Sequence, residues 1–140
     1  MNLVVVTAAI LLVGILIFVH EFGHFIVAKF FGVGVKVFSL GFGRRLFGFE
    51  HGGTDYRVCL LPIGGYVLME GADPFADDDQ IREEMESPTS LLRAPIWQRL
   101  LIVSAGPAFN LGLPVVVLTA LFMAGEQENF VRRMYEGAGN

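Results

Sequence analysis

The stretch His20-Glu21-Phe22-Gly23-His24 lies inside an apolar run that extends from Leu3 to Phe31. An α-helix has about 3.6 residues per turn, so histidines four residues apart lie on one face and can bind the same metal ion. A histidine pair at this spacing, with a glutamate after the first, is typical of zinc hydrolases. Ionisable side chains at membrane depth are costly and tend to be functional. The sequence therefore predicts a zinc site that carries out hydrolysis within the bilayer.

Each residue of this motif has an expected role. We expect His20 and His24 to ligate Zn²⁺ through their imidazole nitrogens. Glu21 is the expected general acid and base, which takes a proton from water and returns it to the leaving amine. Gly23 adds no bulk to its side of the helix, where a substrate backbone could approach. The alternative is a buried cluster that only forms hydrogen bonds between helices.

The composition fits a membrane protein with two spans. The chain has 140 residues, 54% of them hydrophobic, and a mean hydropathy of +0.58. A second apolar run extends from Ile96 to Ala124, and about 20 apolar residues suffice to cross a bilayer. The first run lacks preceding basic residues and a following cleavage site, so we predict a transmembrane helix and not a signal peptide. The net charge of -4 gives no indication of nucleic-acid binding, and the single cysteine, Cys59, is expected to be a small buried hydrophobe.

The second apolar run contains two prolines, Pro107 and Pro114. Proline frees a backbone carbonyl and kinks a helix, so we expect this helix to be bent or broken near its first third. Asn110 lies in the same run, and an asparagine in a span is costly unless it is paired. We expect Asn110 to face the active-site cavity and to bind substrate. Ordinary hydrogen bonding between helices is the alternative.

Residues 32–71 are rich in glycine, β-branched and aromatic residues, which predicts strands. The expected short strands, with a turn at Gly52-Gly53-Thr54, are Val33–Phe38, Leu46–Glu50, Tyr56–Leu61 and Gly65–Met69. The sheet is unusually apolar, so we infer that it dips into the membrane against the metal-binding helix; a sheet lying on the membrane surface is the alternative. Its exposed edge could hold an unwound substrate segment by strand addition. The expected substrate-binding residues there are Gly64, Gly65 and Tyr66.

Residues 72–95 form an acidic stretch, expected to be a solvated loop or a short surface helix. A divalent-ion site among these carboxylates is the less favoured interpretation. Basic residues flank the connection between the two spans, and basic residues concentrate on the cytoplasmic side of membranes. We therefore expect the connection to be cytoplasmic and both termini to be extracytoplasmic. The basic residues nearest the span ends are Lys29, Lys36, Arg93 and Arg99.

Several stretches together resemble the site-2 intramembrane zinc metalloproteases, and most closely the bacterial regulator-of-sigma-E protease type. The resemblance covers residues 10–120 and implies a Zn²⁺ enzyme of the bacterial inner membrane that cuts transmembrane segments of membrane-protein substrates. It also implies a membrane-re-entrant β-hairpin between the first two spans. The matching stretches are 20–24 with Ala28 and Gly32, Phe38–Gly43, Gly53–Tyr56, Pro62–Gly71, and Arg99 with Ala105–Asn110.

The chain departs from this family in three places. Arg44 stands where the family has a proline, and Leu68 where it often has a lysine. The chain also lacks the Leu-Asp-Gly motif whose aspartate supplies the family's third zinc ligand on a later span. His51 and Asp55 are poor substitutes because they lie in a polar turn. We therefore expect the C-terminal half of a larger or split enzyme to supply that ligand, and this piece alone to be inactive.

The predicted fold is an α-helical membrane protein with five parts. These are a first transmembrane helix (1–31), a re-entrant β-hairpin region (32–71), an acidic cytoplasmic loop (72–95), a second transmembrane helix (96–124) and an extracytoplasmic tail (125–140) that leads to a missing PDZ or C-terminal half. Two other functions stay open. One is a non-catalytic membrane module that binds a partner's transmembrane segment. The other is a metal transporter or storage protein, which would need more ligands inside the spans.

Overall fold

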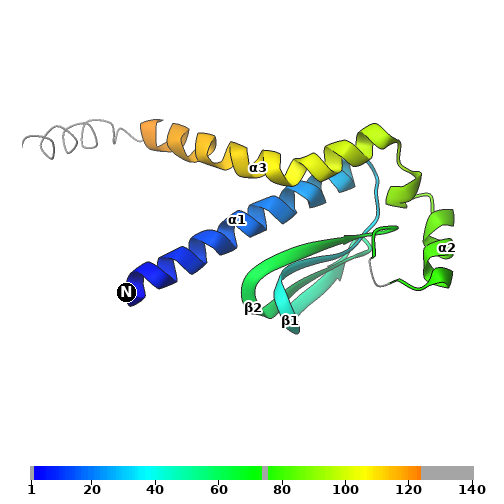
Figure 1. Cartoon of the computed structure of the whole chain (residues 1–140), viewed down its shortest axis with the longest axis horizontal. Coiled ribbons are helices and arrows are strands. Elements are labelled where there is room, and N and C mark those ends of the chain that lie inside the picture. Colours follow the sequence, from blue (N-terminus) through cyan, green and yellow to red (C-terminus); the bar gives the residue numbers. More distant parts are fainter. Residues whose placement is uncertain (1, 74–75, 124–140) are drawn as a thin grey trace, which may run out of the picture.

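The computed structural model describes residues 2–73 and 76–123, and two long helices crossing beside a curved sheet dominate it (Figure 1). Helix α1 extends over Leu3–Phe30 and helix α3 over Ile96–Met123, with 28 residues each. At about 1.5 Å per residue, each is about 42 Å long, against about 30 Å for the hydrocarbon core of a bilayer. Both are long and apolar enough to cross a membrane, as predicted. The predicted tail, 125–140, lies outside the described residues.

The ends of α1 follow from its sequence. Asn2 caps the start, because its side-chain oxygen accepts a hydrogen bond from the amide of Val4 at 3.4 Å. At the other end Gly32 adopts a positive φ of 74°, which glycine does without steric cost, and its amide donates to the carbonyl of Lys29 at 3.1 Å. The chain thereby leaves the helix and enters the sheet.

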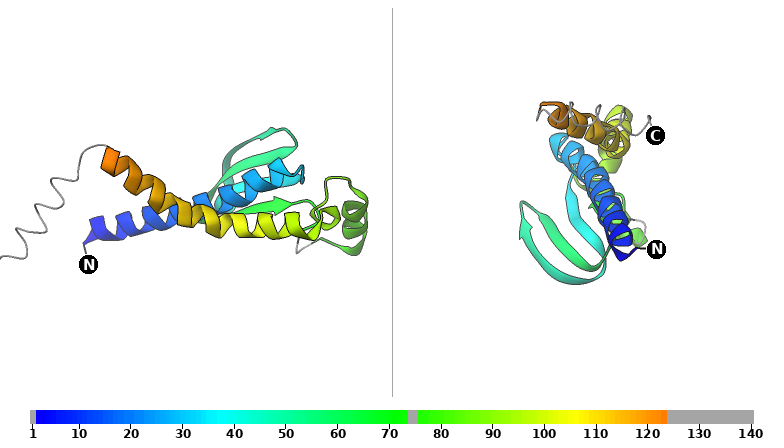
Figure 2. Two further views of the ribbon diagram at one scale, coloured as in Figure 1. Left: turned by 90° about the horizontal axis from the view of Figure 1, so that it is seen from above. Right: turned by 90° about the vertical axis from the view of Figure 1, so that its left-hand side faces the viewer.

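Helix α3 stays helical through both prolines. It changes direction along its length in the two perpendicular views of Figures 1 and 2, as expected where proline removes a backbone hydrogen bond. The predicted bend is confirmed, whereas a broken helix is wrong. The continuous helix allows residues on both sides of Pro107 to face α1.

The sheet consists of strands β1 (Val35–His51) and β2 (Thr54–Met69), joined as an antiparallel hairpin. The connecting turn has positive φ at both central residues, 56° at Gly52 and 73° at Gly53. This conformation suits a two-residue hairpin because its twist matches that of the strands. The predicted turn is therefore confirmed.

The hairpin curls over, so that one part of β1 lies at the centre of the sheet (Figure 1). On one side, the segment Val37–Leu40 pairs with Gly65–Leu68 in the antiparallel sense. On the other side it pairs with Asp55–Val58, and there the residue numbers of both segments increase in the same direction. The second part of β1, from Phe42 to His51, pairs with the first half of β2. Four short separate strands were expected, and each long strand instead combines two of them through bulges. The segment from Gly65 to Met69 is left as one edge of the sheet.

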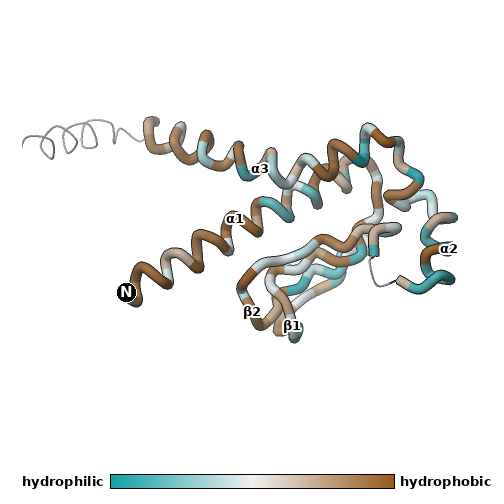
Figure 3. The backbone as a smooth tube through the Cα atoms, in the orientation of Figure 1, coloured by the Kyte–Doolittle hydropathy of each residue, from teal (hydrophilic) through white to brown (hydrophobic). Residues whose placement is uncertain are grey.

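The buried core lies where the end of α1, the start of α3 and the sheet meet. Its fully buried members are Ala28, Val33, Val35 and Ile102. The outer half of the hairpin is different, because large apolar side chains there are exposed: 61% for Leu46, 68% for Phe47 and 67% for Ile63. Figure 3 shows hydrophobic colour along this part of the sheet and along the free halves of both helices. Exposed apolar surface of this extent marks a membrane or protein contact.

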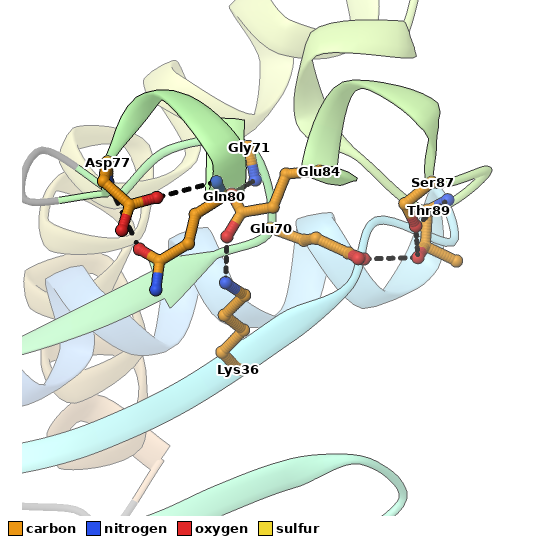
Figure 4. Close-up of polar contacts among 8 residues, drawn as sticks. All are labelled: Lys36, Glu70, Gly71, Asp77, Gln80, Glu84, Ser87 and Thr89. Atoms are coloured by element: carbon orange, nitrogen blue, oxygen red, sulfur yellow. Dashed lines mark hydrogen bonds and ion pairs between the residues drawn. The ribbon is translucent and has the colours of Figure 1, made fainter. Parts of the chain in front are cut away.

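The acidic stretch forms the short helix α2, Asp78–Glu86, followed by the one-turn helix η1, Leu91–Arg93. Asp77 and Gln80 form a capping box at its start. Of the two alternatives for this stretch, the surface helix is therefore confirmed. One of its carboxylates, Glu84, turns inward and accepts hydrogen bonds from Lys36 on β1 and from the amide of Gly71, the latter at 2.6 Å (Figure 4).

Candidate metal centre

The two histidines of α1 lie on one face of the helix and point toward α3. Their ring centroids are 4.8 Å apart, with the ring planes at 76°. Nδ1 of His24 lies 2.7 Å from the carbonyl oxygen of Ile102, and Nδ1 of His20 lies 3.4 Å from Nδ2 of Asn110. Figure 3 shows the hydrophilic stretch of α1 close to where α3 passes over it. Asn110 therefore lies within reach of His20, a contact that fits both a residue facing this site and a hydrogen bond between helices.

The second nitrogens of both rings converge on Gly106 of α3. A Cβ atom added to Gly106 would lie 2.7 Å from Nε2 of His20 and closer still to Nε2 of His24. Zinc binds imidazole nitrogen at about 2.0–2.1 Å, so two nitrogens that share one space beside bare backbone suit a single metal ion. The residues present therefore fit Zn²⁺ through two of its protein ligands.

No third protein ligand joins this pair among residues 2–73 and 76–123. Asp55 forms ion pairs with Arg45 and Arg57, and His51 is exposed at the end of the hairpin. Neither residue was favoured as the third ligand from the sequence, and the structure places neither of them beside the histidine pair. A catalytic zinc normally has three protein ligands.

The expectation for Gly23 is wrong. This glycine is buried against α3, where an added Cβ would lie 2.7 Å from the carbonyl oxygen of Ala105 and 3.0 Å from the ring of Phe109. Small residues let two helices approach closely in a membrane, where packing drives their association. Gly23 therefore allows α3 to approach the histidines and does not open a path for a substrate.

Glu21 faces the sheet, on a different side of α1 from the histidines. A Cβ added to Gly65 would lie 3.6 Å from Cγ of Glu21, and the backbone amide of Val67 lies near the Glu21 carboxylate. Helix α1 thus presents its two imidazoles to α3 and its carboxylate to the edge of β2. The carboxylate lies between the candidate metal centre and the sheet edge.

The predicted substrate-binding residues of β2 lie at this edge. Gly64 has a φ of 109°, and the ring of Phe42 occupies the space that a Cβ would need. Tyr66 stacks on the same ring, with centroids 5.8 Å apart. Of the three residues, Gly65 approaches Glu21. A neighbouring apolar groove of about 380 Å³ is lined by residues of α1 and of the hairpin bend, among them Ile10, Gly14, Phe18, Leu40, Val58 and Pro62.

A family model described as peptidase family M50 matches residues 8–137, which is most of the chain. The chain belongs to peptidase family M50, the site-2 protease family. The geometry around His20 and His24 is therefore that of a protease-family member. With its two apolar helices, this M50 chain is a membrane protein.

Curated relatives of this M50 chain carry the name "putative zinc metalloprotease". A relative from Mesorhizobium japonicum is 40% identical over 115 residues, which cover 77% of this chain and 31% of the relative. One from Helicobacter pylori strain J99 is 39% identical over 119 residues (85% and 33%), and one from Vibrio cholerae is 40% identical over 119 residues (84% and 25%). The chain spans about a quarter to a third of the length of these relatives.

Two residues at the candidate metal centre were not predicted as site residues. The carbonyl of Ile102 binds one histidine, and Gly106 leaves space for both. Ile102, Gly106 and Asn110 follow one another at intervals of four residues, so they lie on one face of α3. That spacing could have identified them, because the asparagine was already assigned to the side facing the site.

Proposed function

We propose that this chain is part of a zinc-dependent endopeptidase that hydrolyses peptide bonds in transmembrane segments of membrane-protein substrates. The observation that carries the proposal is the convergence of the His20 and His24 Nε2 atoms on Gly106, within two apolar helices. Histidines in such surroundings need a strong compensating interaction, and a bound metal supplies one. Membership of the M50 family supports the same conclusion.

In this proposal His20 and His24 hold the metal, and the C-terminal half of the enzyme supplies the third ligand. Zinc bound there supplies Lewis acidity, which lowers the pKa of a water molecule to about 7 and polarises a peptide carbonyl. Glu21 takes the proton from the attacking water and delivers it to the leaving amine when the C–N bond breaks. Its position beside both the imidazoles and the sheet edge suits this transfer.

The substrate segment would bind in extended form along the Gly65–Met69 edge of β2. A helical peptide bond is already hydrogen-bonded, whereas an added strand exposes its carbonyls and gains main-chain hydrogen bonds to the sheet. The amide of Val67 lies near the Glu21 carboxylate, and in this proposal it would donate to a carbonyl of the bound substrate. Gly64, Gly65 and Tyr66 shape this edge, and the apolar groove beside Gly64 suits apolar side chains of a membrane segment.

We further propose the bacterial inner membrane as the location, with the connection cytoplasmic, both ends extracytoplasmic and the hairpin re-entrant. Lys29, Arg93 and Arg99 lie near the ends of α1 and α3 that adjoin the connection. The exposed Leu46, Phe47 and Ile63 support insertion of the hairpin, because lipid would cover them. Paired strands also leave few backbone groups unsatisfied at that depth.

The decisive experiment replaces Glu21 with glutamine in the full-length polypeptide and follows cleavage of a membrane-tethered substrate. We expect Glu21→Gln to lower the cleavage rate by about 100-fold or more, because general acid–base catalysis contributes about 10²–10⁴-fold. Zinc content should not change, since Glu21 is not a ligand. Glu83→Gln, on the exposed side of α2, is the matched control and should cleave normally.

The second candidate is a membrane module that binds a partner's transmembrane segment along the sheet edge without cutting it. The lack of a third metal ligand among residues 2–73 and 76–123 favours this alternative for the isolated chain. Unchanged cleavage in the Glu21→Gln variant would rule out the proteolytic role of the motif. Substrate capture by a full-length polypeptide that never cleaves would establish the binding module.

A further inference from the structure

Helix α3 contacts both candidate metal ligands at the nitrogen that does not face Gly106. The carbonyl of Ile102 lies at Nδ1 of His24, and the side-chain amide of Asn110 lies at Nδ1 of His20. Both Nε2 atoms face the space beside Gly106. The metal-binding tautomer of each ring is therefore decided by what its Nδ1 contacts on α3.

For His24 the contact has one interpretation. A main-chain carbonyl can only accept a hydrogen bond, so Nδ1 of His24 must carry the proton that it donates to Ile102 at 2.7 Å. In the neutral ring Nε2 then keeps its lone pair. This lone pair points to the space beside Gly106.

For His20 the contact depends on which way the amide of Asn110 faces. With Nδ2 toward the ring, His20 Nδ1 acts as the acceptor and its Nε2 carries the proton, which prevents ligation. In that orientation Oδ1 of Asn110 is buried and has no hydrogen-bond partner among the described residues. The two ends of an amide have nearly the same shape, so the hydrogen bonds decide its orientation. Turning the amide over gives Oδ1 a partner and frees Nε2 of His20.

We propose that Asn110 is a positioning residue: its Oδ1 accepts the Nδ1 proton of His20, so that Asn110 and the Ile102 carbonyl together direct both Nε2 atoms to a metal ion beside Gly106. This inference rests on the proposed zinc site and replaces the expected role of Asn110 in substrate binding. Side chains that orient metal-bound histidines typically contribute about 10–100-fold to metal affinity or activity. Asn110 acts through His20 and touches no reacting atom.

The test measures zinc affinity in the full-length polypeptide by competition with a chelator, alongside the imidazole tautomers by ¹⁵N NMR. Asn110→Leu keeps the size but removes the acceptor, and should lower zinc affinity by about 10–100-fold and leave His20 in mixed tautomers. Asn110→Asp retains an acceptor and should keep both the affinity and the tautomer. The matched control is Ser104→Ala, since the exposed Ser104 hydroxyl donates only to Leu100 of its own helix at 2.7 Å.

The outcomes separate this inference from the proposed function. Unchanged zinc affinity and an unchanged His20 tautomer in Asn110→Leu would overturn the positioning role. A raised KM in that variant would then show that Asn110 binds substrate, as first expected. Neither result concerns Glu21, whose role is measured by cleavage. Loss of affinity in both Asn110 variants with normal helix content would also overturn the inference, because the acceptor would then not matter.

Discussion

Two carboxylates, Glu21 in α1 and Glu84 in α2, are withdrawn from solvent in very different surroundings. Glu84 is 8% exposed, and it is satisfied by the ammonium of Lys36 and the amide of Gly71 (Figure 4). Glu21 is half-buried in an apolar helix, beside two imidazoles and one backbone amide. Among residues 2–73 and 76–123, no lysine or arginine forms an ion pair with it.

This difference separates a carboxylate that holds structure from one available for chemistry. The Glu84 contacts tie α2 to β1 and to the chain leaving β2, so its charge has a fixed structural partner. The Glu21 carboxylate has contacts that a substrate or a metal can exchange, which suits a group that must take up and release a proton. The kind of partner, more than burial, distinguishes the two roles.

A large effect is expected at Gly106, whose backbone lies beside the imidazoles. Gly106→Ala places a methyl group where both Nε2 atoms converge, so zinc affinity and cleavage should fall by about 10-fold or more, as when metal-orienting groups are lost. Competition with a zinc chelator measures the affinity. Gly112→Ala in the same helix is the control, because an added Cβ there meets nothing within 4 Å. Equal zinc binding in both variants would place the metal elsewhere.

A smaller effect is expected at Glu84. Glu84→Gln removes the charge paired with Lys36 and keeps one acceptor, so docking of α2 should weaken by about 1 kcal/mol, the net worth of one hydrogen bond. Hydrogen exchange at the Gly71 amide reports this directly. Cleavage should be unchanged, which sharpens the contrast with Glu21→Gln. Loss of cleavage in the Glu84 variant would show that α2 is coupled to the metal centre.

The smallest effect is a pH dependence of the same contact. The hydrogen bond from Lys36 lowers the pKa of Glu84 below its ordinary 4.5, and the Gly71 amide acts in the same direction. A lowered folded-state pKa means that this stabilisation is complete above about pH 4.5 and is lost as the pH falls through the lower, folded-state value. The protection of the Gly71 amide from hydrogen exchange, relative to an unstructured peptide at the same pH, should therefore fall only in acid. Loss of this protection near pH 6 would assign the change to another group.

Sequence patterns predicted the parts of this molecule that depend on local spacing. The two spans follow from apolar length, the histidine pair from helical periodicity, and the hairpin turn from Gly52 and Gly53. Local patterns could not show that Gly23 packs against Ala105. A glycine that faces a substrate path and a glycine that faces another helix have the same local sequence pattern. Glu84 was equally hidden, since nothing in an acidic run indicates which member turns inward to Lys36.

The pairing of the sheet also could not be predicted from local sequence patterns. Alternation and glycine spacing located the strand segments, but the double pairing of Val37–Leu40 depends on how far the hairpin curls. That curl is a tertiary property, set by bulges and by packing against α1. The contact between Asn110 and His20 likewise joins residues from two helices far apart in the chain.

The position of Val37–Leu40 between two partners has a consequence for where a peptide would be cut. The Gly65–Met69 edge cannot slide by one residue without breaking pairings that also fix the middle of the sheet. A slip of one residue would turn every amide of that edge to the opposite side. The edge is therefore held in a fixed register relative to Glu21. In the proposed strand addition, this register would select one bond of the bound segment by its distance along the strand.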